Sequence, residues 1–315
     1  MAHFQSGSTY NFVDTISGQG NSFFVPEIYS KKVQIALRKA AVAEAVCNTD
    51  YMGEISSFGD TVNIIKEPQI AVADYTRGLA VTSTDLTDQE LVLTVDQAKS
   101  FSFKIDDLEK RFSHVNFQAI AADNAAYALR DAMDSNILAA ISAGATATTG
   151  MGTTSTPIDI GFGSGEVDPL NQMALAAKEL DEANAPEDGR WFVAAPEWYN
   201  QLSNSASKLL SVDFNAGQGS IRNGLVASGL LRGFSMYKSN NLPTNDLSGA
   251  TPAGSATAPE ALFGHMSSTA AASSMNKVET VRDTGTFSDI VRGLMVWGRK
   301  VLRPEVAGKI IYAID

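Results

Sequence analysis

Cysteine and histidine are scarce in this chain. Its 315 residues contain one cysteine, Cys47, and three histidines, His3, His114 and His265, which lie far apart in the sequence. A single thiol excludes an intramolecular disulfide and a cysteine-rich zinc site, and the scattered histidines disfavour a histidine-based metal site or catalytic triad. We therefore expect no metal and no cofactor.

The chain also has fewer basic than acidic residues, and it lacks long apolar runs. The chain has 24 lysines and arginines against 35 acids, a net charge of −11, and so has no overall attraction for a phosphate backbone. No stretch approaches the roughly 18 apolar residues of a spanning helix. The first residues lack the basic and apolar regions of a secretory signal. We expect neither a sequence-specific nucleic-acid reader, nor a membrane protein, nor a secreted one.

Enough apolar material remains for a sizeable core, since 44% of the residues are hydrophobic. Residues 1–26 differ from the rest because they contain no lysine, arginine or glutamate, and their aromatic residues, among them Phe12, Phe23 and Phe24, follow no period. Such an arm needs a surface for its aromatic side chains, on its own body or on a neighbour. The alternative is a disordered tail.

The segment 27–50 is predicted to hold a helix. Pro26 and Glu27 suit a helix start, and Ile28, Ile35 and Val42 recur at intervals of seven. This spacing predicts an amphipathic helix over residues 27–47.

The segment 51–105 changes to a period of two. Apolar residues alternate over 61–66, 91–95 and 101–105, which predicts three strands. The stretch 67–90 between the first two is an acidic excursion that buries too little to be stable by itself. We expect it to contact another surface through Glu67, Asp74, Tyr75, Arg77, Asp85 and Asp88.

A long helix and a mixed second half complete the chain. Residues 114–143 contain neither glycine nor proline, and Ser113 is a suitable N-cap, so a rod helix is predicted up to Gly144. After a Gly/Thr/Ser-rich boundary over 144–165, Asp168 and Pro169 open a second helix. A buried strand, a short helix, a polar loop and several strands follow. The fold class is α+β.

Motifs that carry chemistry are weak. The run from Gly161 to Gly165 resembles a phosphate loop only in its glycine count. The acids Asp106, Asp107 and Glu109 have no partner base, which favours a salt-bridged or solvated cluster over an acid–base pair. The basic residues near the C-terminus have three interpretations: contacts with acidic loops of a neighbouring copy, contacts with DNA, or a solvated face. The sequence supports a solvated face at least as well as contacts, and among the contacts it favours those with a neighbouring copy over those with DNA, through Arg292, Arg299, Lys300 and Arg303.

An ordered series of short motifs resembles a known family. It resembles the major capsid proteins of tailed double-stranded DNA bacteriophages, with the Hong Kong 97-like fold, and within them the coat proteins of short-tailed P22-type phages. The motifs are Phe24–Ser30, Tyr51–Ile55, Gly59–Val62, Asp74–Arg77, Asp96–Asp107, Leu180–Asn184, Gly189–Val193, Pro196–Tyr199, Gly233–Phe234, Ser239–Pro243 and Arg292–Gly298.

The resemblance implies names for the parts of the chain. These are an N-terminal arm (1–26), an N-terminal helix (27–50), an E-loop with flanking strands (51–105), a peripheral domain with a spine helix (106–149), an axial domain (150–260) and C-terminal strands that return to the peripheral domain (261–315).

The resemblance also implies a function and partners. The chain would be a non-enzymatic subunit that self-assembles as pentamers and hexamers into an icosahedral shell around double-stranded DNA. Scaffolding and portal proteins, and in some members decoration proteins, would be its partners. Assembly would occur in the host cytoplasm. Two alternatives stay open: a cargo-enclosing nanocompartment shell of the same fold, and an α+β enzyme or binding domain.

Overall fold

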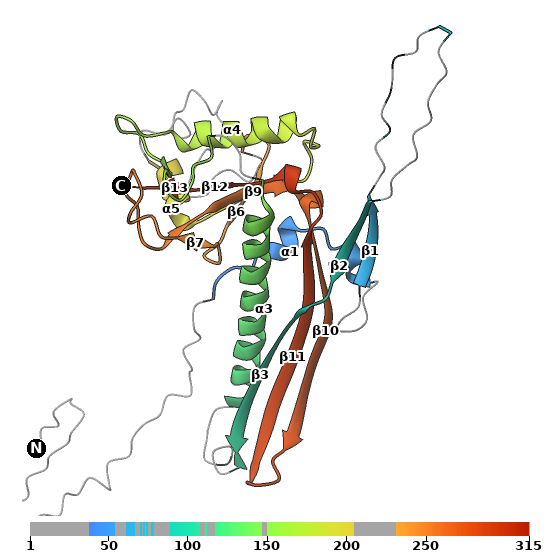
Figure 1. Ribbon diagram of the computed structural model, residues 1–315. Helices are drawn as coiled ribbons and strands as arrows, with labels where there is room; N and C mark the ends of the chain where they lie inside the picture. The colour runs from blue at the N-terminus through green and yellow to red at the C-terminus, as the bar shows by residue number, and fades with distance from the viewer. Residues whose placement is uncertain are drawn as a thin grey trace, which may run out of the picture.

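A long helix beside a long antiparallel sheet dominates the molecule (Figure 1). The computed structural model describes residues 38–53, 61–66, 89–107, 117–146, 150–204 and 231–314, together with Ile70, Val72, Asp74, Arg77, Gly78 and Arg111. Helix α3 (Phe117–Gly144) runs along the sheet, whose strand order is β10–β11–β3. These strands are β3 (Gln97–Asp106), β10 (Thr269–Arg282) and β11 (Ser288–Val301).

The predicted rod helix is confirmed from Phe117 to Gly144, while its predicted cap Ser113 lies outside the described residues. Leu129, Met133 and Ile137 are buried as expected. Ala126, on the same stripe, is exposed. The N-terminal half of α3 therefore leaves part of its surface uncovered.

A four-stranded sheet forms the body at the other end of α3, in the order β12–β9–β5–β6. The strands are β5 (Arg190–Ala194), β6 (Ser235–Lys238), β9 (Ala261–His265) and β12 (Ala307–Ile310). Strand β5 is buried throughout, as predicted. Phe192 belongs to one core with Trp198, and Trp191 to a second with Met133 of α3. Because side chains alternate along a strand, this single strand joins two cores.

Two short helices cover the outer face of this sheet, and both are confirmed. Helix α4 (Pro169–Glu182) begins where the Asp168 carboxylate accepts the Leu170 N–H at 2.8 Å. Helix α5 (Pro196–Leu202) begins at a proline, which suits the first helical position. The remaining short elements are η2 (Asp50–Gly53), β4 (Ile158–Asp159), β7 (Thr244–Asn245), β8 (Ala258–Pro259), η5 (Met266–Ser268), η6 (Pro304–Val306) and β13 (Tyr312–Ala313).

The hairpin of β1 (Thr61–Lys66) and β2 (Gln89–Thr94) lies to one side of the long sheet (Figure 1). Its strands were predicted and are confirmed. Leu93 is fully buried and packs in a small cluster with Val95, Ala270 and Val296, which fixes the base of the hairpin.

The predicted helix over 27–47 is confirmed only at the end of its described part. Residues 38–42 are not helical, and α1 covers only Ala43–Val46. The reason is that side chains of α3 take the backbone donors of this segment. Tyr127 Oη accepts the Lys39 N–H at 2.6 Å, and Asp134 Oδ1 accepts those of Val42 and Ala43 at 2.7 Å each.

The strands of residues 261–315 divide among three sheets. Strands β10 and β11 form the long sheet with β3. In contrast, β9 and β12 pair within the sheet of β5, and β13 pairs with β4. The apolar residues Ile310 and Tyr312 explain this difference, since both are buried in the core beneath α4 and α5. Among the described residues, the helices are too short or too polar to cross a bilayer.

Candidate functional site

Most of the contact residues predicted from the sequence lie outside the described residues: Phe12, Phe23, Phe24, Glu67, Tyr75, Asp85 and Asp88. Asp74 and Arg77 are described, and both are exposed. The role of these residues in contacts stays a prediction.

Apolar side chains, rather than acids alone, are exposed along the hairpin and its excursion. The exposed fraction is 72% for Ile65, 73% for Ile70 and 97% for Val72. Large hydrophobic side chains that are exposed on a projecting segment are candidates for contact with a partner. Sequence reasoning missed these residues because it weighed the acidic balance of the excursion and not the aliphatic residues scattered through it.

The four basic candidates do not form one patch, because Arg292 lies apart from the other three. Arg292 lies seven residues before Arg299 on β11, which separates them by about 23 Å along the strand. Each already has an acidic partner: Arg292 is hydrogen-bonded to Glu279 on β10, and the Arg299 guanidinium lies 3.6 Å from Asp96. Lys300 and Arg303 are exposed near the end of β11. They are thus the better-placed basic candidates.

The far end of the long sheet is a turn held by ion pairs. Arg282 bridges Asp107 and Asp289. The Asp283 carboxylate accepts from Lys104 Nζ at 2.6 Å and from Thr286 Oγ1 at 2.7 Å. The hydrogen bond from Lys104, followed by that from Thr286, holds the pKa of Asp283 well below its usual range.

Apolar residues stand at this same end. Phe287 in the turn is 80% exposed, and Val278 and Val281 on β10 are also exposed. A turn that ion pairs hold and that carries an exposed phenyl ring is a second candidate contact surface, which the sequence reasoning did not identify. The signal available in the sequence was a lone phenylalanine within the polar run from Asp283 to Ser288.

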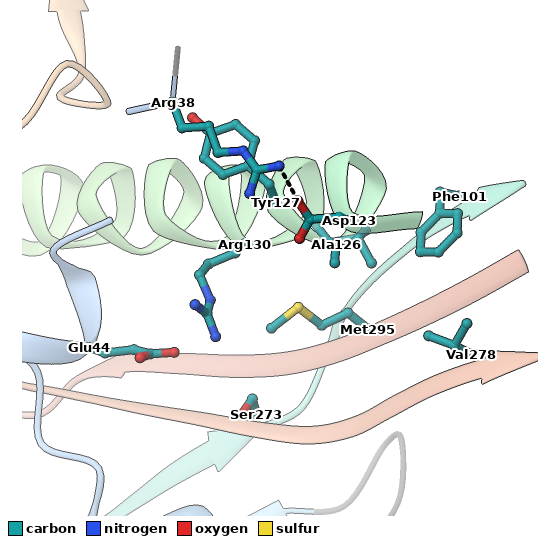
Figure 2. Close-up of a pocket in the computed structure, with 11 residues that line it drawn as sticks. Arg38, Glu44, Phe101, Asp123, Ala126, Tyr127, Arg130, Ser273, Val278 and Met295 are labelled. Carbon is teal, nitrogen blue, oxygen red and sulfur yellow. Dashed lines mark hydrogen bonds and ion pairs between the residues drawn. The ribbon is translucent and has the colours of Figure 1, made fainter. Parts of the chain in front are cut away.

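A groove of about 380 Å³ lies between α3 and the strands β10 and β11. Figure 2 shows Asp123, Tyr127 and Arg130 on the helix, with Met295 and Val278 on the strands. Arg38 lines the groove as well. Its guanidinium is hydrogen-bonded to Asp123 and lies 5.2 Å from the centre of the Tyr127 ring. This hydrogen bond lowers the pKa of Asp123.

The chemical motifs of the sequence serve structure in the molecule. The Gly163 N–H donates to the Glu166 carboxylate. This N–H is therefore already bonded and is not available to a phosphate. Asp107 pairs with Arg282. Burial raises the pKa of the Cys47 thiol to about 12, which keeps it protonated and unreactive. Across the described ranges, no three His, Cys, Asp or Glu side chains gather as metal ligands.

Comparison with known proteins gives one family match. A family model described as phage capsid protein matches residues 88–310. None of the curated proteins matches the chain.

Solved structures show the same fold over most of the chain. A structure described as Mycobacterium phage Che8 is 30% identical, with a TM-score of 0.77, and the match covers 91% of this chain and 97% of that chain. The capsid of the cyanophage P-SCSP1u is 22% identical, with a TM-score of 0.70 and coverage of 95% and 96%. The capsid of a native GTA particle is 12% identical, with a TM-score of 0.63 and coverage of 96% and 100%.

Proposed function

The chain belongs to the phage capsid protein family, as a structural major capsid protein rather than an enzyme, and we propose that its copies form pentamers and hexamers that close into an icosahedral shell around double-stranded DNA. The protein is located in the virion, as part of a capsid built from many subunits. The finer points of the proposal are the capsomer types, the packaged DNA, scaffolding and portal partners, and assembly in the host cytoplasm.

The observation that carries the proposal is the exposed apolar surface on parts that extend from the body. Ile65, Ile70 and Val72 on the hairpin and its excursion, and Phe287 at the end of the long sheet, face water in a single copy. Burying such side chains stabilises an interface by about 1.5–3 kcal/mol each. Subunits that pack edge to edge in closed symmetry supply the missing contacts.

The excursion is proposed to lie on a neighbouring copy, near exposed basic groups. Lys300 and Arg303 are the candidates, since Arg292 and Arg299 already have acidic partners. The acids of the excursion, such as Asp74, would add an electrostatic component to the apolar contact. We therefore expect added salt to weaken the electrostatic component of this contact and to leave the apolar component in place.

A P22-type, short-tailed phage as the source is a further part of the proposal. Its support is the ordered series of motifs from Phe24 to Gly298. Electron microscopy of virions that contain this coat protein tests it. A short tail is the expected result, and a long tail would refute the assignment.

Removal of the excursion tests the main proposal. Lys66 and Gln89 are paired across the hairpin, so residues 67–88 can be replaced by Gly-Gly without disturbing β1 and β2. The variant should keep the melting temperature of the unassembled subunit, because the excursion lies beyond the buried base of the hairpin. It should form no closed particles in negative-stain electron microscopy.

The matched control replaces only the four acidic residues Glu67, Asp74, Asp85 and Asp88 by their amides and keeps the length of the excursion. Closed particles from the shortened chain would refute the contact. Wild-type particles that form without scaffold and enclose protein instead of DNA would favour a nanocompartment shell.

A further inference from the structure

The turn that joins the body to the long sheet follows one histidine. Strand β9 ends at His265, η5 comes next, and β10 begins at Thr269. The Ser268 carbonyl accepts the N–H groups of Leu302 and Arg303 at 2.7 and 3.1 Å, which holds the chain after β11 to the same turn. Both long strands therefore meet the body at η5.

Both ring nitrogens of His265 are bonded, and their partners decide where the proton lies. Nδ1 lies 3.1 Å from the Ser267 backbone nitrogen and 2.8 Å from the Ser267 hydroxyl. Nε2 lies 2.8 Å from the carbonyl oxygen of Asp188. A backbone N–H can only donate and a carbonyl can only accept. The ring is therefore neutral in this arrangement, with its proton on Nε2 and with Nδ1 as an acceptor.

The Nδ1 atom caps η5. His265 stands at the N-cap position of this turn, and its side chain accepts the N–H two residues further on. Serine, threonine, asparagine and aspartate commonly fill this position. Histidine differs from them because it changes charge between about pH 5 and pH 8. A proton can therefore remove this cap.

A second proton on the ring breaks one bond and spares the others. Once Nδ1 carries hydrogen, it donates to the Ser267 hydroxyl, which reverses its role, while Nε2–H still donates to Asp188. The Ser267 N–H has no such choice, because it then meets a donor in place of an acceptor. The His265 side chain is only partly buried, so solvent protons reach it.

Charged residues of both signs lie on the elements packed around His265. Arg190 is its direct partner across the pair of β5 and β9, and it is bonded to Asp181. The others belong to the loop before β5 and to η6 with its cap, which contacts η5: Glu187, Asp188, Arg303 and Glu305. These charges set the pH at which the ring gains a proton, whereas the bonds at Nδ1 set what that proton breaks.

We propose that His265 is a proton-sensitive switch at the junction of the body and the long sheet, in which protonation of Nδ1 releases the Ser267 N–H and loosens η5. The bond from Nε2 to Asp188 stays, so the turn loosens toward β10 and not toward β5. Because the Ser268 carbonyl also holds Leu302 and Arg303, the release reduces the restraint on both long strands. The inference goes beyond the proposed function, since it concerns a single copy.

Hydrogen exchange of the full chain as the unassembled subunit tests the switch. After correction for the intrinsic effect of pH, the Ser267 amide should exchange about fivefold faster or more at about pH 5.5 than at about pH 7.5, as the loss of one hydrogen bond implies. The Met266 amide donates to the Gly189 carbonyl on the β5 side, so its protection should not change. Equal protection of Ser267 at both pH values would overturn the proposal.

Two substitutions separate the proton on His265 from other effects of acid. His265→Asn keeps an acceptor at the cap position but does not titrate in this range, so Ser267 should stay protected at both pH values. His265→Ala removes the acceptor, so Ser267 should exchange fast at both. The other histidines, His3 and His114, remain in each variant. A pH response that persisted in His265→Asn would therefore belong to another group and would refute the switch, with or without a folded alanine variant.

Discussion

At the scale of single residues, Asp134 joins three segments of the chain. It is 2% exposed, and its carboxylate accepts the N–H groups of Val42 and Ala43 and, at 2.9 Å, the side-chain amide of Asn241. A buried carboxylate is tolerated when donors surround it in this way. The residue therefore ties the N-terminal segment and the loop after β6 to α3.

Asp134→Ala should destabilise the unassembled subunit by about 2–4 kcal/mol, because it leaves several buried donors without an acceptor. Urea unfolding followed by circular dichroism measures the change. The control is Ser135→Ala, one residue further on α3 and exposed, which should stay within about 0.5 kcal/mol of the wild type. An Asp134→Ala variant as stable as this control would contradict the role of the carboxylate.

Asp283 gives a prediction for the pH dependence of stability. Its pKa in the folded chain is lowered, first by the hydrogen bond from Lys104. The interaction therefore contributes its full stabilisation above the unfolded pKa of about 4 and loses it as the pH falls further. The difference in melting temperature between wild type and Asp283→Asn should be largest near neutral pH and should shrink below about pH 4.

The Lys104→Gln variant removes the other partner of this ion pair and should show the same pattern against pH. Differential scanning fluorimetry between pH 7 and pH 3 records both series. A difference that does not change with pH would contradict the interpretation.

At the scale of elements, the sequence predicted structure well where the deciding signal is local. It failed where contacts between distant residues decide the structure. The Asp168–Pro169 start of α4 and the run without glycine or proline in α3 act within their own segments, so the sequence reveals them. Residues 38–42 carried an equally regular pattern but are bound by Tyr127 and Asp134 of α3. The spacing of Ile28, Ile35 and Val42 cannot reveal acceptors about ninety residues away.

The candidate contact surfaces show the same difference between local signals and contacts of distant residues. The excursion between β1 and β2 was predictable because its composition cannot form a core. The exposed Phe287 was not, since its position depends on the turn that Arg282, Asp283 and Lys104 hold together. Likewise, the separation of Arg292 from Arg299 follows from both residues lying on one long strand, β11.

At the scale of the whole molecule, shape and exposed surface carry the function. One rod helix, one long sheet and one projecting hairpin extend from a body that contains the two main cores. The net charge of −11 makes copies repel one another at long range. Apolar contacts that act only at short range must therefore overcome this repulsion, and added salt should assist assembly through screening while it weakens local ion pairs.

Val72 and Asp74 separate these two contributions, since both are exposed on the excursion. Val72→Asp should raise the protein concentration needed for shell assembly by about tenfold or more at every salt concentration, because it removes an apolar contact of about 1.5 kcal/mol or more. Asp74→Asn should alter mainly the dependence on salt. Light scattering across a series of protein and NaCl concentrations measures both effects. If Val72→Asp assembled like the wild type while Asp74→Asn did not, charge rather than apolar burial would hold the subunits together.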